Sequence, residues 1–138
     1  MPSIERINSS ADIRAWKDNL PLHYKYTYGV AGQKFVSGLK EGKIIASRCK
    51  FCKTAYLPPK LYCTNCFKKI DDFEEVNVKG KVVALAVGKK TYGFVTFEGF
   101  TGGLVHFASE RCKVGDSVKP VFKAEREGRI TDIMYFMP

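Results

Sequence analysis

The stretch from residue 49 to residue 66 reads CKFCKTAYLPPKLYCTNC, and the spacing of its cysteines decides the local fold. Two residues separate the cysteines of each pair, and ten residues separate the two pairs. A two-residue gap lets one tight turn present two thiolates to the same ion, and zinc takes four such ligands in a tetrahedron. Ten residues are enough for a short hairpin that brings the turns together. The sequence therefore predicts one zinc ion held by Cys49, Cys52, Cys63 and Cys66.

Two disulfides or a redox cysteine pair are the alternatives to a metal site. The longest apolar run covers residues 82–87, far short of the ~20 residues that span a bilayer. Glu5 and Arg6 stand where a signal peptide would need an apolar stretch. We therefore expect a cytoplasmic protein, in which thiols stay reduced and disulfides are disfavoured. A redox function would not explain why the pair occurs twice, and four thiolates leave zinc no open position, so the ion is expected to be structural.

Two helices are predicted before the cysteines. Ser9 and Asp12 form a helix start signal, apolar residues follow at helical spacing, and Pro21 ends this helix. A second helix fits Val30–Glu41, with Gly42 placed as its C-terminal stop. Core packing is the expected role of the apolar positions, and a partner surface is the alternative. We expect residues 1–42 to form an N-terminal helical segment and residues 43–70 to form the zinc ribbon.

Strand patterns dominate residues 71–138. The expected strands are Phe73–Gly88, with a bend at Gly80, then Tyr92–Glu98, Leu104–Ala108, Val118–Ala124 and Arg129–Met137. A first strand that pairs with both halves of a small closed barrel must turn a corner, and a glycine or a bulge allows this. Five strands of this kind favour an OB-type barrel, with a five-stranded sandwich or an open sheet as alternatives. The predicted fold class is mainly β with N-terminal helices (α+β).

The sequence offers no convincing active site. Cys112 stands alone in a polar stretch, and nothing places His23 or His106 beside it as a base. We interpret Cys112 as an incidental thiol and His106 as a strand residue. Paired carboxylates, a glycine-rich phosphate loop and a serine-histidine-acid grouping are lacking, so we expect a protein that is not an enzyme. A free-standing reductase or thioesterase is the weakest alternative.

The order of motifs resembles that of a known family. The motifs are two N-terminal helices, the run GKIIASRC at residues 42–49, YLPPK at 56–60, the second cysteine pair, and VGDSVKPVF and GRITD at 114–122 and 128–132. Together they resemble the DUF35 family of zinc-ribbon and OB-fold proteins associated with acyl-CoA enzymes. The resemblance implies a rubredoxin-like ribbon and a C-terminal OB-fold. It also implies a non-catalytic partner of thiolases or hydroxymethylglutaryl-CoA synthases, as in archaeal isoprenoid synthesis, that bridges such enzymes or helps to hold coenzyme A or acyl-CoA.

The charge distribution is compatible with such a ligand. The net charge of +9 divides into +3 for residues 1–40, +6 for residues 41–70 and zero for residues 71–138. A basic patch attracts phosphate-bearing molecules, and coenzyme A carries several phosphate charges. Arg48, Lys50 and Lys60 flank the zinc loops and are the candidate phosphate contacts. The alternative for each lysine is a solvated surface charge.

A single-stranded nucleic-acid-binding module is the alternative function. Ribbons and OB-folds both bind nucleic acid, and the sequence pI is about 9.4. Stacking on the barrel would need aromatic residues there, and the candidates are Phe94, Phe97, Phe100 and Phe107. The barrel half is neutral, however, and Phe94 and Phe97 have opposite strand parity, so nucleic acid is the less favoured partner.

Overall fold

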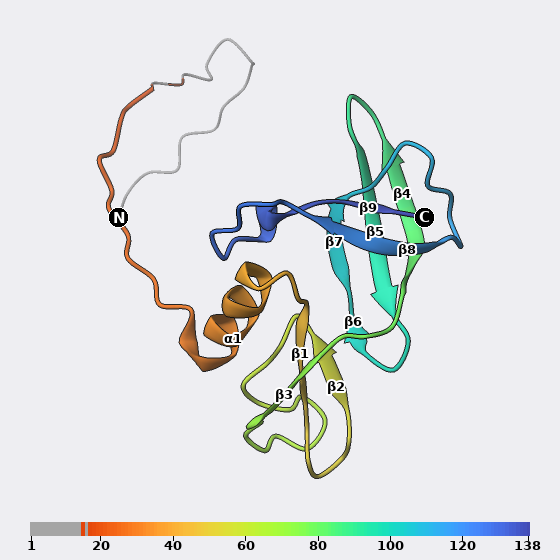
Figure 1. Ribbon diagram of the computed structural model, residues 1–138. Helices are drawn as coiled ribbons and strands as arrows, with labels where there is room; N and C mark the ends of the chain where they lie inside the picture. Colours follow the sequence, from red (N-terminus) through yellow and green to blue (C-terminus); the bar gives the residue numbers. More distant parts are fainter. Residues whose placement is uncertain (1–14, 16) are drawn as a thin grey trace, which may run out of the picture.

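A computed structural model describes residue 15 and residues 17–138 of the chain. One helix packs beside a small sheet that carries the cysteines, and a barrel follows (Figure 1). The described part contains one α-helix rather than the two that were predicted. The start of the first predicted helix, at Ser9 and Asp12, lies outside the described residues. Residues 17–20 have no regular secondary structure, and Leu20 is 69% exposed, so the apolar contact that would stabilise a helix there is missing.

The helix α1 spans Gly29–Lys40 and ends as the sequence predicts. Gly42 adopts a φ of 78°, and its N–H donates to the carbonyl of Leu39. The N–H of Lys43 donates to the carbonyl of Gly38, which completes a Schellman-type C-cap. A side chain at Gly38 would collide with Ile45, so this glycine lets the helix approach the ribbon sheet closely. No helix of the described residues has the length and apolarity needed to cross a membrane.

The ribbon sheet draws strands from three parts of the chain. Its order is β3 (Asp72–Glu75), β1 (Ile45–Arg48), β2 (Ala55–Leu57) and β6 (Thr101–Gly102). The predicted first barrel strand is thus divided, because residues 72–75 pair with β1 rather than with barrel strands. Across this pairing, Glu74 of β3 accepts two hydrogen bonds from the guanidinium of Arg48 in β1, which attach β3 to the ribbon sheet by side chains as well.

Five strands form a nearly closed barrel of OB type, as expected. Their order is β7 (Leu104–Phe107), β5 (Thr91–Phe97), β4 (Gly80–Val87), β8 (Ser117–Phe122) and β9 (Ile133–Met137). A parallel bridge between Ala108 and Phe136 joins the two outer strands. The first barrel strand, β4, pairs with both β5 and β8. It begins at Gly80, where it pairs with both neighbours, and its register against β5 shifts between Val82 and Ala84, as at a β-bulge.

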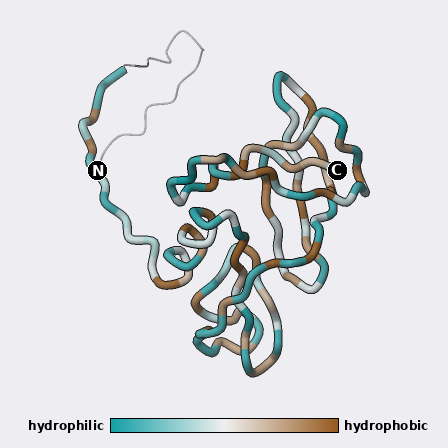
Figure 2. Tube along the Cα trace, viewed as in Figure 1, coloured by the Kyte–Doolittle hydropathy of each residue, from teal (hydrophilic) through white to brown (hydrophobic). Residues whose placement is uncertain are grey.

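The main hydrophobic core contains residues of the helix, the ribbon and the barrel. Leu39 of α1 and Ala46 and Leu57 of the ribbon sheet lie in the same buried cluster as Val82 and Phe136 of the barrel. A second, much smaller cluster surrounds the cysteines and consists of Cys49, Tyr56, Cys63 and Ile70, with Cys52 and Cys66 packed against it. Hydrophobic colouring follows the barrel strands, whereas the β4–β5 turn and the loop before β9 are hydrophilic (Figure 2). The part of the ribbon around the two cysteine pairs, which we call the outer ribbon, therefore buries few apolar side chains of its own.

The loop before β9 is held by one buried carboxylate. A short 3-10 helix, η2 (Ile130–Asp132), ends at Asp132, which is 2% exposed. Asp132 accepts hydrogen bonds from the backbone N–H groups of Glu127, Gly128 and Arg129 at 2.7–3.1 Å. Burial raises the pKa of this carboxyl, but the three donors outweigh burial, so the net pKa lies below its usual range.

Candidate metal centre

The two cysteine pairs sit on turns with the same hydrogen bonds. In the first turn, the N–H of Lys53 donates to the carbonyl of Cys49, and the N–H of Cys49 donates to the carbonyl of Thr54. In the second turn, the N–H of Phe67 donates to the carbonyl of Cys63, and the N–H of Cys63 donates to the carbonyl of Lys68. The equal spacing in the sequence thus produces two equivalent zinc knuckles.

Each knuckle contains a residue with left-handed backbone. Lys53 has a φ of 64° and Phe67 has a φ of 61°, and each directly follows a cysteine pair. Glycine adopts this conformation more easily than any other residue. The chain therefore accepts a local conformational cost at both knuckles in order to aim two sulfur atoms at one point.

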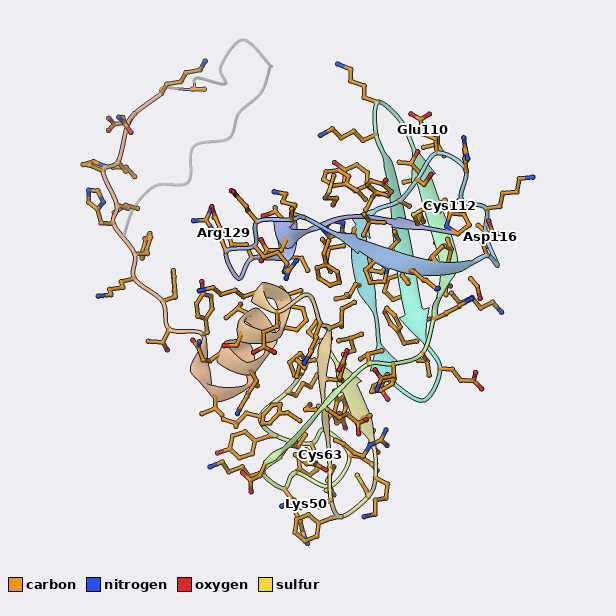
Figure 3. All side chains as sticks on the ribbon, in the orientation of Figure 1. Lys50, Cys63, Glu110, Cys112, Asp116 and Arg129 are labelled. Carbon is orange, nitrogen blue, oxygen red and sulfur yellow. The ribbon has the colours of Figure 1, made fainter. Side chains whose placement is uncertain are left out.

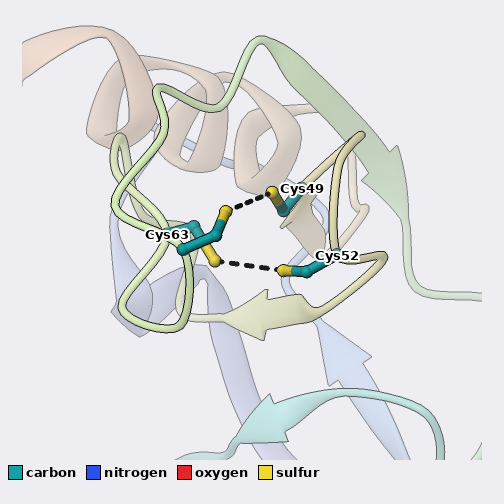
Figure 4. A group of neighbouring side chains, drawn as sticks. Cys49, Cys52 and Cys63 are labelled. Carbon is teal, nitrogen blue, oxygen red and sulfur yellow. Dashed lines mark hydrogen bonds between the residues drawn. The ribbon is translucent and has the colours of Figure 1, made fainter.

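The four sulfur atoms converge as a zinc site requires. All four lie within 4.8 Å of one another, and Figure 4 shows the cysteine side chains of the two knuckles facing each other. Cys49 Sγ lies 3.4 Å from Cys66 Sγ, and Cys52 Sγ lies 3.3 Å from Cys63 Sγ. Zinc–sulfur bonds of about 2.3 Å in a tetrahedron place the sulfur atoms about 3.8 Å apart. The donor set and its geometry therefore fit a zinc ion, with no room for a fifth, exchangeable ligand.

Polar neighbours favour the thiolate form of two ligands. The side-chain hydroxyl and the backbone amide of Thr54 lower the pKa of Cys52 to about 5. For Cys63, burial raises the pKa. The Tyr56 hydroxyl and the backbone amides of Cys66 and Asn65 lower the pKa by a larger amount, so the net pKa lies below the usual value. Deprotonated sulfur is the form that binds metal, so these contacts prepare the site for a cation.

The fourth ligand shows why a cation is needed. The backbone amide of Lys68 lowers the pKa of Cys66, but burial and the neighbouring thiols raise it more, to about 11. A further negative charge among four sulfur atoms is unfavourable unless a positive ion shares the space. A divalent cation removes that penalty and releases the remaining protons.

Tyr56 supports the site and was not identified from the sequence. Its side chain is 2% exposed, and its hydroxyl lies 3.2 Å from Cys63 Sγ. The same hydroxyl accepts the N–H of Thr64 at 3.2 Å and lies 3.0 Å from Thr64 Oγ1, so it is placed between the second knuckle's backbone and the sulfur. Groups of this kind orient metal ligands and tune their basicity. Strand periodicity carried no signal for this contact, because it joins β2 to the second knuckle.

The predicted phosphate contacts do not form one cluster of free charges. Arg48 donates to Glu74 at 2.7 and 3.0 Å and to the carbonyl of Lys53 at 2.9 Å. Lys60 is exposed, and its Nζ lies 5.0 Å from the ring centroid of Tyr56. Lys50 is exposed at the end of the ribbon farthest from the barrel (Figure 3). Of the three, the two lysines are free to meet an anion without breaking an ion pair.

Cys112 and His106, the residues considered as nucleophile and base, contact backbone groups of the barrel. Cys112 is buried, and its Sγ lies 3.6 Å from the carbonyl oxygen of Phe136. Burial raises the pKa of this thiol. The ring of His106 accepts the N–H of Phe107 at Nδ1, and its Nε2 lies 3.1 Å from the carbonyl oxygen of Ile130. His23 is exposed. Within the described residues, these groups make no nucleophile–base pair.

The barrel aromatics lie on different faces. Phe97 is buried and packs near Phe136, with ring centroids 6.4 Å apart, whereas Phe94 is half-buried on the other face of β5. Phe107 packs against Tyr92 with centroids 4.8 Å apart. The opposite parity expected for Phe94 and Phe97 is therefore observed: Phe97 faces the core, whereas Phe94 and Phe107 share the outer face of β5 and β7 with Tyr92.

Comparison with known proteins identifies similar folds. The family model for the ChsH2 rubredoxin-like zinc ribbon domain matches residues 36–72. A solved structure of a protein of unknown function from the DUF35 family of Sulfolobus solfataricus is 30% identical, with a TM-score of 0.64, and the match covers 67% of this chain and 78% of that chain. A chain of the structure described as "Ltp2-ChsH2(DUF35) aldolase" is 20% identical, with a TM-score of 0.59, and the match covers 77% of this chain and 92% of that chain. No curated protein matches the sequence.

Proposed function

Because the chain belongs to the DUF35 family, we propose that it is a non-catalytic accessory protein of acyl-CoA metabolism. In this proposal it binds coenzyme A or acyl-CoA and partners an enzyme of the thiolase or hydroxymethylglutaryl-CoA synthase type. The structural neighbour named for an aldolase supports this proposal most directly. That protein carries the same fold over 92% of its chain and is named together with Ltp2 in an aldolase. A ribbon and barrel of this kind therefore occur beside an enzyme subunit, and we assign this chain a comparable role.

The chemistry of the metal centre supports a non-catalytic role. Four cysteine ligands occupy all positions of a tetrahedral zinc ion, so the ion has no site for substrate or activated water. Zinc in this chain would hold the knuckles together. Cys112 and His106, the other candidates for chemistry, are engaged with backbone groups in the barrel. The proposal therefore assigns the reaction to the partner enzyme.

The phosphates of coenzyme A have two candidate positions. One is the ribbon surface that carries Lys50 and Lys60. Arg48 would join them only by exchanging Glu74 for a phosphate, because Glu74 already accepts two of its hydrogen bonds. The other is a barrel cavity of about 510 Å³ beside the β4–β5 turn, whose lining includes Lys89, Lys90 and Arg111. Ligand cavities usually measure about 300–1,000 Å³, so the second position has the volume for part of the ligand.

Titration calorimetry with coenzyme A tests the ligand and its position. On the ribbon model, the double variant Lys50→Gln/Lys60→Gln should weaken binding about tenfold, which corresponds to about 1.4 kcal/mol. Glu74→Gln should then tighten binding, since it frees Arg48. On the barrel model, Lys89→Gln/Arg111→Gln should weaken binding instead, with Lys119→Gln as a surface control. Absence of binding to the wild-type, zinc-loaded protein would refute the ligand part of the proposal.

Affinity purification from the native cell tests the partner. A thiolase or a hydroxymethylglutaryl-CoA synthase, identified by mass spectrometry and reproduced with the two purified proteins, is the expected result. Turnover of acetyl-CoA or acetoacetyl-CoA by the purified chain alone should be undetectable. Recovery of ribosomal or transcription components in place of an acyl-CoA enzyme would overturn the proposal.

A further inference from the structure

The end of the zinc ribbon carries an unusual combination of exposed rings and lysines. We define the ribbon tip as the knuckle residues Lys50, Phe51, Lys53, Phe67, Lys68 and Lys69. Phe51 is 62% exposed and Phe67 is 80% exposed. Figure 3 shows Lys50 at the end of the ribbon that points away from the barrel. Neither ring contributes to the hydrophobic clusters of the chain, so apolar packing gives no reason for their presence.

The charge of the tip is uncompensated. Residues 42–70 include seven basic residues and no acidic residue. Within the described residues, ion pairs involve Lys43 and Arg48 of this stretch and none of the lysines at the tip. The barrel half of the chain is neutral, so the tip is the part of the molecule that would attract a polyanion.

The rings and the cations are interleaved. Lys50 precedes Phe51, and Lys68 follows Phe67, so each ring has a cation beside it in the chain. The Nζ of Lys68 also lies 3.7 Å from the centroid of the Phe51 ring, which links the two knuckles. Phe67 keeps its ring outside although its φ of 61° would suit glycine better. The left-handed backbone serves the metal site, as it does at Lys53, so the exposed ring of Phe67 is the feature that a ligand would account for.

We propose that the ribbon tip binds single-stranded nucleic acid, with bases stacked on Phe51 and Phe67 and phosphates held by the surrounding lysines. A single strand offers a flat base and a negative phosphate at every repeat, so it uses both features at once. None of the tip residues lines the four described cavities, which suits an extended polymer better than an enclosed small molecule.

A lipid surface fits the tip less well. Insertion of Phe51 below the head groups would carry the ammonium of Lys68, which lies over the ring, toward the hydrocarbon. Burial of that charge is costly. A base that stacks on the opposite face of the ring leaves the ammonium in place, close to the phosphates. The geometry therefore favours nucleic acid over an anionic membrane.

Fluorescence anisotropy with labelled oligothymidylate and oligouridylate tests this inference on the full, zinc-loaded chain. Contact with three or four phosphates predicts that log K falls against log salt concentration with a slope of about −2 to −3. Phe51→Ala and Phe67→Ala should each weaken binding about tenfold. Lys68→Gln should reduce the steepness of the salt slope by about 0.7. Tyr26→Ala, at a side chain that is 81% exposed outside the ribbon, and Lys119→Gln on the barrel should bind as the wild type does.

Leucine variants separate stacking from general apolar contact. Phe51→Leu and Phe67→Leu keep an apolar side chain but lose the flat face, so they should weaken oligonucleotide binding nearly as much as alanine. Equal zinc content shows that each variant retains the ribbon. If the variants at one phenylalanine lose zinc, oligonucleotide binding by the variants at the other phenylalanine tests the inference. Absence of saturable binding at low salt, leucine variants that bind as the wild type, or binding to phosphatidylserine vesicles without binding to oligonucleotide would each overturn the inference. Lys50 belongs both to the tip and to the ribbon position proposed for coenzyme A. Because none of these variants changes Lys50 or Lys60, titration of each variant with coenzyme A shows whether a loss of oligonucleotide binding is separate from the proposed function.

Discussion

The ribbon and the barrel are stabilised in different ways, although they share one chain and part of one core. The barrel buries Val82, Val95, Val118 and Phe136 almost completely and closes its sheet through paired strands. The outer ribbon has a second cluster in which two of the four buried residues are cysteines. A segment with so little apolar burial needs a further source of stability, and metal ligation provides it.

The difference also separates the roles of the two regions. The barrel can tolerate changes at its neutral surface because its own core specifies the fold. The ribbon carries the positive charge, the exposed rings and the metal, and its shape depends on four sulfur atoms. A small segment held by an ion can present charged and aromatic side chains at its surface without needing them for a core.

Loss of a metal ligand should give the largest effect. Cys63→Ser, or removal of zinc by a strong chelator, is expected to unfold the outer ribbon, since zinc contributes about 10–16 kcal/mol to folding in zinc-finger peptides. Hydrogen exchange should show lost protection at the knuckle amides of Cys49, Lys53 and Phe67, while amides of β4 and β5 stay protected. Cys112→Ser is the control and should retain one zinc ion. Simultaneous loss of barrel protection would show that the two regions are not separable.

The joint between ribbon and barrel should be the next most sensitive place. Gly102 in β6 has a φ of 93°, and a side chain there would collide with the carbonyl of Leu57 in β2. Gly102→Ala is therefore expected to destabilise the protein by about 3 kcal/mol in urea unfolding. Gly99→Ala is the matched control, because Gly99 has a φ of 86° but open space around it, and should cost about 1 kcal/mol. Equal losses for the two variants would contradict the close approach of β2 and β6.

Acid should weaken the barrel through Asp132. The folded pKa of Asp132 lies below its unfolded value, so its contribution to stability is complete above pH ~4 and is lost as the pH falls through the folded pKa. Thermal unfolding of Asp132→Asn should therefore show a lower Tm near neutral pH and a smaller decrease of Tm between pH 5 and pH 3, relative to the wild type. An unchanged pH profile in this variant would show that the loop before β9 does not depend on the carboxylate.

A knuckle glycine should give a small gain. Lys53→Gly relieves the left-handed backbone and is expected to raise stability by about 0.5–1 kcal/mol. Glycine keeps both backbone hydrogen bonds of Lys53, from its N–H to Cys49 and from Arg48 to its carbonyl. Lys50→Gly is the control and should be neutral or destabilising, since Lys50 does not have a positive φ. The comparison is best made by denaturant unfolding of the zinc-loaded proteins. A loss of stability in Lys53→Gly would mean that its side chain contributes a contact that the structure does not reveal.

Local patterns in the sequence predicted the elements that depend on local physics. The spacing of two cysteine pairs indicated the knuckles, the glycine after α1 indicated its C-cap, and five strand patterns indicated the OB-type barrel. Each of these features is determined by residues a few positions apart.

Features that join distant parts of the chain were not predicted. The pairing of β3 with β1 and of β6 with β2 depends on which edges meet in space, and strand periodicity carries no information about that. The ion pair between Arg48 and Glu74 arises from the pairing of β1 and β3. The first predicted helix had start and stop signals, but its described end finds no apolar partner in the fold, and such signals alone do not stabilise a short helix.

X-ray absorption at the zinc edge, together with elemental analysis of purified, tag-free protein, decides whether the four cysteines hold a zinc ion. We expect one zinc ion per chain with four sulfur neighbours at about 2.3 Å. Protein without tightly bound zinc or a substitute ion, or a spectrum with oxygen or nitrogen neighbours in place of sulfur, would contradict a ribbon held together by these four cysteines.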